Sequence, residues 1–166
     1  MVQKGIILGH VISSEGIEVD EAKIDLISNL PPPRTVKDIR SFLEHVGFYR
    51  RFIKEFSKIS RPLYNLLAKN VTFVFDEECL KAFEKIEALL NNAPIIQPPN
   101  WDELFEIMCD AFDYAIGAVL GQHVNRLPYV IYYASKTLSD AQYNYSTTKK
   151  EPLAVVFVLD KFCSYL

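Results

Sequence analysis

The stretch LFEIMCDAFDYAIGAVLGQ (residues 104–122), continued by PYVIYYAS (128–135), decides the fold of this chain. It contains three apolar runs, at 104–111, 115–122 and 128–135, and short turns separate them. Runs of this length and spacing predict strands that follow one another as a meander. Apolar residues at helical spacing then predict a helix over 148–166. The inward face expected for this helix carries Leu153, Val156, Phe157, Leu159 and Phe162.

The chain before this stretch is patterned for helices. Apolar residues recur every three or four positions from Ile39 to Phe56, and Thr35 is suited to cap a helix that begins there. A mainly basic line has the same spacing, comprising Lys37, Arg40, Glu44, Gly47, Arg51, Lys54 and Lys58. If 35–58 is one straight helix, these residues form one cationic edge; a break at Gly47 would give two patches. We expect Pro62 to end this unit.

The remaining elements are predicted from turn and cap signals. Residues 3–13 favour a strand or hairpin, and a turn follows at 13–16. Asp20 is suited to cap a helix that ends near Asn29. Residues 71–75 favour a short strand or an extended connector, and a helix begins after them at Asp76 or Glu77. The Pro-rich stretch 94–101 is the expected domain boundary.

The charge is unevenly distributed. The net charge of the 166 residues is −3, which taken whole argues against a nucleic-acid binder. Residues 34–69, however, hold nine Lys and Arg against three Asp and Glu, a net charge of +6. The segments 1–33 and 70–166 carry −3 and −6. The basic block 34–69 is therefore a candidate contact for phosphates.

Several classes of protein are excluded by composition. No apolar run approaches the roughly 20 residues that span a bilayer, and the first residues lack a secretory signal pattern. The three cysteines and three histidines are scattered, without disulfide or zinc spacing. We therefore expect an intracellular chain, cytoplasmic or nuclear, that is not secreted and does not contact membranes.

Several longer strings carry a family resemblance. They are ILGHVISSEGIEVDEAKI (7–24), PPPRTVKDIRSFLEHVGFYRRFIKEFSKISRPLYNLL (31–67), CDAFDYAIGAVLGQ (109–122) and YYASKTLSDAQYNYSTTKKE (132–151). The chain resembles a piece of the Pol polyprotein of Ty3/gypsy-type LTR retrotransposons, over nearly its whole length. The resemblance implies an α+β fold, in which a helical thumb and connection precede a partial RNase H-like domain made of a three-stranded meander and one helix.

The resemblance also implies a division of the chain into four parts. Residues 1–13 correspond to the end of the reverse-transcriptase palm and resemble its primer grip. Residues 14–70 correspond to the thumb, 71–100 to the connection or linker, and 101–166 to a truncated RNase H-like domain.

The chemistry implied is hydrolysis of RNA in RNA–DNA hybrids by two Mg²⁺ ions, which hard carboxylate ligands hold. Asp110 matches the first catalytic Asp of the family and Glu151 its catalytic Glu, and both are expected metal ligands. Gly9 and His10 match the primer grip. The implied partners are an RNA–DNA hybrid or a nucleic-acid duplex, together with the remainder of the Pol polyprotein.

Two departures from the family pattern affect this expectation. Phe112 replaces the usual Ser two residues after Asp110. Pro152 follows Glu151. The last helix either has Thr148 as its N-cap, with Glu151 in its third and Pro152 in its fourth position, or begins at Pro152 with Glu151 outside. The polymerase aspartates and the third and fourth RNase H carboxylates of the family have no match in this chain.

Three functions therefore remain open at the level of sequence. The first is a fragment of a reverse transcriptase with RNase H that we expect to catalyse neither reaction alone. The second is a non-catalytic nucleic-acid-binding module that uses the basic block, with Arg50, Arg51, Lys54 and Lys58 as the phosphate contacts. The third is a degenerate relic with no selected function.

Overall fold

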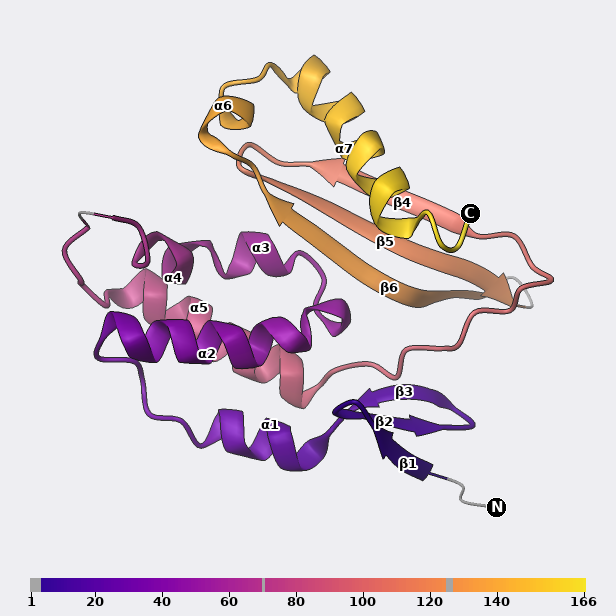
Figure 1. The fold of residues 1–166 in the computed structure, drawn as a ribbon, viewed down its shortest axis with the longest axis horizontal. Coiled ribbons are helices and arrows are strands. Elements are labelled where there is room, and N and C mark those ends of the chain that lie inside the picture. Colours follow the sequence, from indigo (N-terminus) through magenta and orange to yellow (C-terminus); the bar gives the residue numbers. More distant parts are fainter. Residues whose placement is uncertain (1–3, 70, 125–126) are drawn as a thin grey trace. The chain divides into compact units, whose positions relative to one another are not determined.

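The structure is a computed structural model that describes residues 4–69, 71–124 and 127–166. It contains two compact units. The first takes the residues up to Ile53 together with Ile59–Ile95, and the second takes Lys54–Lys58 together with Ile96–Leu166 (Figure 1). The predicted α+β class is confirmed. Predicted ranges that include positions 1–3 and 70 reach beyond the described residues.

The first unit opens with a small antiparallel sheet in the order β1-β2-β3. Its strands are β1 (Lys4–Ile7), β2 (His10–Ser13) and β3 (Gly16–Val19). Leu8 and Gly9 connect β1 to β2 with φ angles of 48° and 74°. Positive φ at both central residues matches a type I′ turn, whose twist suits the flanking strands. The predicted hairpin is confirmed, whereas the third strand was not predicted.

Side-chain caps start the three longer helices of this unit, and each cap lies where the sequence predicted it. The helices are α1 (Glu21–Ser28), α2 (Val36–Phe48) and α5 (Glu77–Asn91). Asp20 and Asp76 accept hydrogen bonds from Ala22 N and Cys79 N, at 3.1 and 2.9 Å. Thr35 and Asp38 form a capping box. These polar caps satisfy N–H groups that have no partner within the helix.

Residues 35–58 do not form one straight helix, and the alternative of a break at Gly47 lies within one residue of the observed helix end. Helix α2 ends at Phe48, and a 3-10 turn η1 (Arg50–Phe52) follows. Glu55 then has a φ of +57°, in the left-handed region that no α-helix passes through. Apolar residues keep helical spacing across this break, so periodicity could not locate it.

The segments after the break are short. They are α3 (Phe56–Ile59) and α4 (Arg61–Asn65). Pro62 lies in the first turn of α4, where its missing N–H has little effect, so the expectation that it ends the unit is wrong. Residues 71–75 form the extended connector rather than a strand. The fully buried side chains of the first unit include Ile39, Val46, Leu63, Ile86 and Leu90.

The second unit contains the predicted meander, an antiparallel sheet in the order β4-β5-β6. Its strands are β4 (Glu106–Ala111), β5 (Ala115–Val124) and β6 (Leu127–Thr137). The register pairs Asp110 with Gly117, and Gly117 with Ser135. A short helix α6 (Asp140–Tyr143), which was not predicted, precedes the long α7 (Thr147–Phe162).

Helix α7 packs on one face of this sheet (Figure 1). The buried cluster combines Leu120 and Ile131 of the sheet with Val158 and Phe162 of the helix. The inward face expected for α7 is confirmed at Leu153, Phe157 and Phe162, which pack into the buried clusters. It is wrong at Val156 and Leu159, which are 63% and 50% exposed. The buried positions are Lys150, Ala154, Val158 and Phe162, spaced four residues apart.

Of the two predicted starts of the last helix, the start at Pro152 is wrong. The helix begins at Thr147 with Ser146 as its N-cap, two residues before the predicted cap Thr148, so Glu151 and Pro152 both lie inside it, as that alternative expected. The backbone N–H groups of Lys149 and Lys150 bond to the Ser146 carbonyl at 2.9 and 3.0 Å, which closes the first turn. Pro152 has no N–H to donate to the carbonyl of Thr148, a residue that is exposed.

Within the described ranges, no helix is both long and apolar enough to cross a membrane.

Candidate functional site

Asp110 is the next-to-last residue of β4, and it is exposed. Side chains alternate between the two faces of a sheet along a strand. Ile107 and Ala111 of the same strand pack into the clusters that α7 covers. Asp110 therefore lies on the opposite face, at a register position shared with Gly117.

That opposite face carries a small cavity of about 170 Å³. Its lining residues are Lys54, Glu55, Met108, Cys109, Asp110, Phe112, Gly117, Ala118 and Val119. A Cβ on Gly117 would lie 3.4 Å from the Phe112 ring and 3.7 Å from Cγ of Glu55. The segment that contains Glu55 therefore lies close to the sheet at Gly117.

Glu151 is the fifth residue of α7 and is exposed. The neighbouring Lys150 is buried, and its Nζ donates to the backbone carbonyl of Asp113 at 2.7 Å. The carboxylate of Asp113 is 4.0 Å from the same Nζ, but it is 92% exposed. Lys150 thus fixes the first turns of α7 to the β4–β5 turn, three residues beyond Asp110.

Asp110 and Glu151 offer the oxygen donors that Mg²⁺ prefers, so they suit this ion in kind. Mg²⁺ is usually bound by one or two carboxylates, with waters and substrate phosphates as its other ligands. Across the residues that the structure describes, no group of three or more His, Cys, Asp or Glu side chains could hold a metal ion. Asp110 and Glu151 would therefore hold such an ion together with other ligands.

The four predicted phosphate contacts are divided between the two units. Arg50 and Arg51 belong to η1 in the first unit, where Arg50 is exposed and Arg51 half-buried. Lys54 and Lys58 belong to the second unit. Because α2 ends before all four, the expected cationic edge on one helix is wrong. Their contact with nucleic acid stays a prediction.

The segment 54–58 is anchored by buried groups within the second unit. Ser57 is buried, and its backbone N–H donates to Oγ of Ser135 at 3.0 Å. Oγ of Ser135 donates in turn to Oγ of Ser57 at 3.0 Å. Nζ of Lys58 lies 3.9 Å from the centre of the Phe112 ring and 3.3 Å from a carboxylate oxygen of Glu55. The segment therefore has a defined position on the sheet.

Gly9 and His10 lie at the β1–β2 turn, where aromatic side chains surround them. A Cβ on Gly9 would lie 3.2 Å from the Phe48 ring, and its carbonyl accepts a hydrogen bond from the Tyr49 hydroxyl at 3.0 Å. The His10 ring lies 4.8 Å from that of Phe48 and is stacked 5.8 Å from that of Phe52. Burial lowers the pKa of His10, so its ring is neutral at neutral pH.

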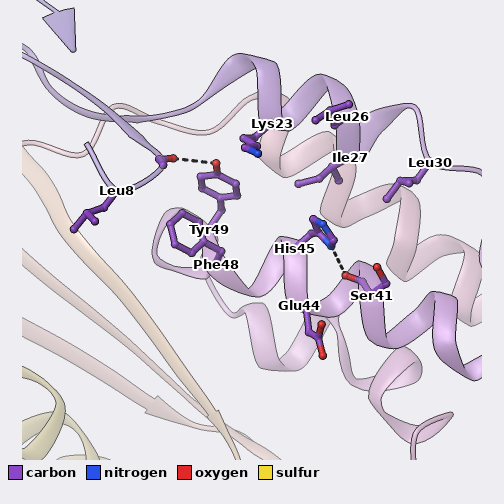
Figure 2. A pocket seen from close by; sticks show the side chains of 11 residues that line it. Leu8, Lys23, Leu26, Ile27, Leu30, Ser41, Glu44, His45, Phe48 and Tyr49 are labelled. Carbon is purple, nitrogen blue, oxygen red and sulfur yellow. Dashed lines mark hydrogen bonds between the residues drawn. The ribbon is translucent and has the colours of Figure 1, made fainter. Parts of the chain in front are cut away.

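A larger cavity of about 710 Å³ lies next to this turn, between α1 and α2 (Figure 2). Apolar side chains of both helices line it, and the polar side chains of Lys23, Glu44 and His45 also contribute to its walls. Figure 2 shows the Tyr49 hydroxyl reaching toward the turn and His45 bonded to the Ser41 carbonyl. No sequence motif pointed to this cavity, because its walls come from three separate segments.

The sequence also gave no sign that Lys54 and Glu55 lie beside Asp110. They are more than fifty positions apart in the chain, and the chain turns toward the sheet at Glu55, whose φ is in the left-handed region. Phe112 departs from the family pattern. Its ring is the surface on which Lys58 lies.

Comparison with known proteins identifies the second unit. Residues 75–166 match the family described as the RNase H-like domain found in reverse transcriptase. The match includes Asp110, Glu151 and all of β4, β5, β6 and α7. It begins before the predicted RNase H-like boundary at residue 101; the predicted four-part division stays a prediction.

The similar curated proteins are transposon polyproteins. The Pol polyprotein of transposon opus from Drosophila melanogaster is 34% identical over 170 residues, which cover 96% of this chain and 17% of that protein. The Pol polyprotein of transposon 297 from the same organism is 36% identical, covering 96% and 15%. The Tf2-3 polyprotein of Schizosaccharomyces pombe is 34% identical, covering 96% and 12%. This chain thus spans less than a fifth of these relatives.

Solved structures support the same fold. The foamy viral protease-reverse transcriptase in complex with RNA/DNA hybrid matches with a TM-score of 0.83 and 23% identity, over 98% of this chain and 22% of that one. The complex of that enzyme with dsDNA matches with the same TM-score and identity, over 99% and 34%. The predicted resemblance to Ty3/gypsy-type Pol polyproteins is confirmed, and the chain belongs to the family of RNase H-like domains found in reverse transcriptases.

Proposed function

We propose that this chain is a nucleic-acid-binding part of a retrotransposon reverse transcriptase and that it binds RNA–DNA hybrids. The observation that carries the proposal is the exposed Asp110 on β4, inside the unit that matches the RNase H-like family. The similar foamy viral enzyme was solved with an RNA/DNA hybrid, which supports this choice of partner. The chain would act as one part of a longer Pol polyprotein, as in its relatives.

Asp110 and Glu151 are the residues that would hold Mg²⁺ in this proposal. The bound ion would activate water and stabilise the leaving oxygen during hydrolysis of the RNA strand. Strand β4 positions Asp110, and the contact of Lys150 with the Asp113 carbonyl positions the start of α7. Because two carboxylates are few ligands for two ions, we expect the chain alone to bind hybrid without cutting it.

The test is hybrid binding by the complete chain, with and without Mg²⁺, measured by fluorescence anisotropy. We expect Mg²⁺ to strengthen binding several-fold in the wild type, because an ion held by Asp110 would offset the charge of this carboxylate and attract the phosphate backbone. Asp110→Asn should remove this gain, whereas the matched control Asp113→Asn should keep it. The proposal is abandoned if the wild-type chain shows no affinity for hybrid at low salt. Mg²⁺-dependent cleavage that Asp110→Asn abolishes would instead show that the chain is active alone.

A further inference from the structure

The part of the basic block that lies beside Asp110 is the segment 54–58. The buried Phe56 and the two hydrogen bonds between Ser57 and Ser135 anchor it within the second unit. The adjacent Lys54 and Glu55 are thereby held at the wall of the Asp110 cavity. A lysine next to an anchored segment loses less freedom on binding than one in a mobile loop.

The charges around this cavity are not all equivalent. Glu55 is paired with Lys58 at 3.3 Å, so these two charges largely offset each other. Lys54 is exposed, and among the ion pairs and hydrogen bonds between described residues it has no partner. Lys54 and Asp110 line the same cavity without pairing. One cation therefore remains available for a ligand next to the exposed carboxylate.

We infer that Lys54 binds a backbone phosphate of the nucleic acid that lies over Asp110. This inference rests on the proposed function and adds a substrate-binding residue to that site. A carboxylate and a phosphate repel each other, so a neighbouring cation favours the approach of the phosphodiester backbone. A lysine binds phosphate as a point charge and needs no fixed geometry. The arrangement therefore suits a phosphodiester of any sequence.

The sequence had grouped Lys54 with Arg51 on a single helix edge. The structure instead places Lys54 on the sheet of the RNase H-like unit, together with Phe112 and Gly117. Phe112 replaces a small family residue and provides the ring under Lys58. Phe112 and Gly117 thus help to hold the segment that presents Lys54.

The experiment compares the salt dependence of hybrid binding in Lys54→Gln, Lys136→Gln and the wild-type chain. Lys136 is also an exposed lysine of the same unit. It is paired in register with Ile116, and its Nζ lies 5.9 Å from the centre of the Phe157 ring, on the face that α7 covers. Loss of one phosphate contact should reduce the slope of log affinity against log salt by about 0.9 and weaken binding at physiological salt roughly threefold. We expect both effects in Lys54→Gln and neither in Lys136→Gln.

The outcomes separate this inference from the proposed function. If the wild type binds hybrid and Lys54→Gln keeps its slope and affinity, the inference is overturned and the proposed function stands. Equal losses in Lys54→Gln and Lys136→Gln would show a general charge effect and would also overturn it. If the wild type does not bind hybrid, the proposed function fails and this inference fails with it. Circular dichroism of both variants excludes loss of folding.

Discussion

The first turns of helices α2 and α7 are held in different ways. In α2, Thr35 Oγ1 accepts from Asp38 N at 3.2 Å, and Asp38 Oδ2 accepts from Thr35 N at 2.9 Å. In α7, the side chain of the N-cap Ser146 makes no capping hydrogen bond, and Pro152 lies inside the helix. The start of α2 is thus encoded by neighbours in sequence, whereas that of α7 depends on contacts with the sheet.

The largest expected effect tests the dependence of α7 on the sheet. Phe162 is fully buried in the cluster with Leu120 and Ile131. Truncation to alanine leaves a cavity, so Phe162→Ala should lower the free energy of unfolding by about 3–5 kcal/mol. Urea unfolding followed by circular dichroism measures this loss. The control Leu159→Ala, at a side chain that is half exposed, should cost far less; equal costs would show that packing does not hold α7.

The second prediction removes the internal proline. Pro152 supplies no N–H to the helix and crowds the preceding turn, which costs a helix interior up to about 3 kcal/mol. Pro152→Ala should therefore raise the melting temperature, and the matched Pro62→Ala should not, because Pro62 lies in the first turn of α4. A lower melting temperature in Pro152→Ala would mean that the proline is needed to set the course of α7.

The third prediction concerns the buried lysine that joins α7 to the β4–β5 turn. Lys150→Met keeps the length of the side chain but leaves the Asp113 carbonyl without its partner. The loss of a hydrogen bond from a charged donor should cost about 2 kcal/mol. Hydrogen exchange should become faster at the first turns of α7. The exposed neighbour Lys149→Met serves as control, and identical exchange in both variants contradicts this account.

The sequence predicted the features that depend on neighbouring residues better than those that depend on tertiary contacts. Caps at Asp20, Thr35 and Asp76 were correctly placed because each acts on N–H groups two or three residues away. The end of α2 was left open between two alternatives, and the N-cap of α7 was placed two residues late, at Thr148 instead of Ser146. Apolar spacing continued past Glu55 despite its positive φ. Ser146 and Thr148 are both residue types that cap helices, so the sequence did not separate them.

The candidate site was predictable only in part, because some of its residues come from distant segments of the chain. Asp110 and Glu151 were found because family motifs are read along the chain. The position of Lys54 beside Asp110 was not found, since it arises from a segment that packs on a distant sheet. Contacts between residues far apart in sequence depend on the folded chain, and one sequence alone does not encode them in a local pattern.

The fourth prediction tests the local start of α2. Thr35→Ala removes the oxygen that accepts from Asp38 N, and loss of such a cap should cost about 1 kcal/mol. Ser146→Ala is the matched change at the start of α7 and should cost close to nothing, because that hydroxyl makes no cap. Thermal unfolding of both variants gives the comparison. A larger cost at Ser146 would reverse the contrast between the two helices.

The smallest effect is a dependence on acid that the start of α2 should show and the start of α7 should not. Hydrogen bonds from the backbone of Arg34 and from Thr35 lower the pKa of Asp38. A carboxyl with a lowered pKa stabilises the folded chain above its unfolded pKa and loses that contribution as the pH falls through the folded value. The start of α2 should therefore loosen below about pH 4, where Asp carboxyls take up protons. Amide hydrogen exchange at Val36–Asp38 measures this loosening, and Asp38→Asn should remove its pH dependence. Helix α7 has no acidic cap, so its exchange should be the same in the wild type and in Asp38→Asn.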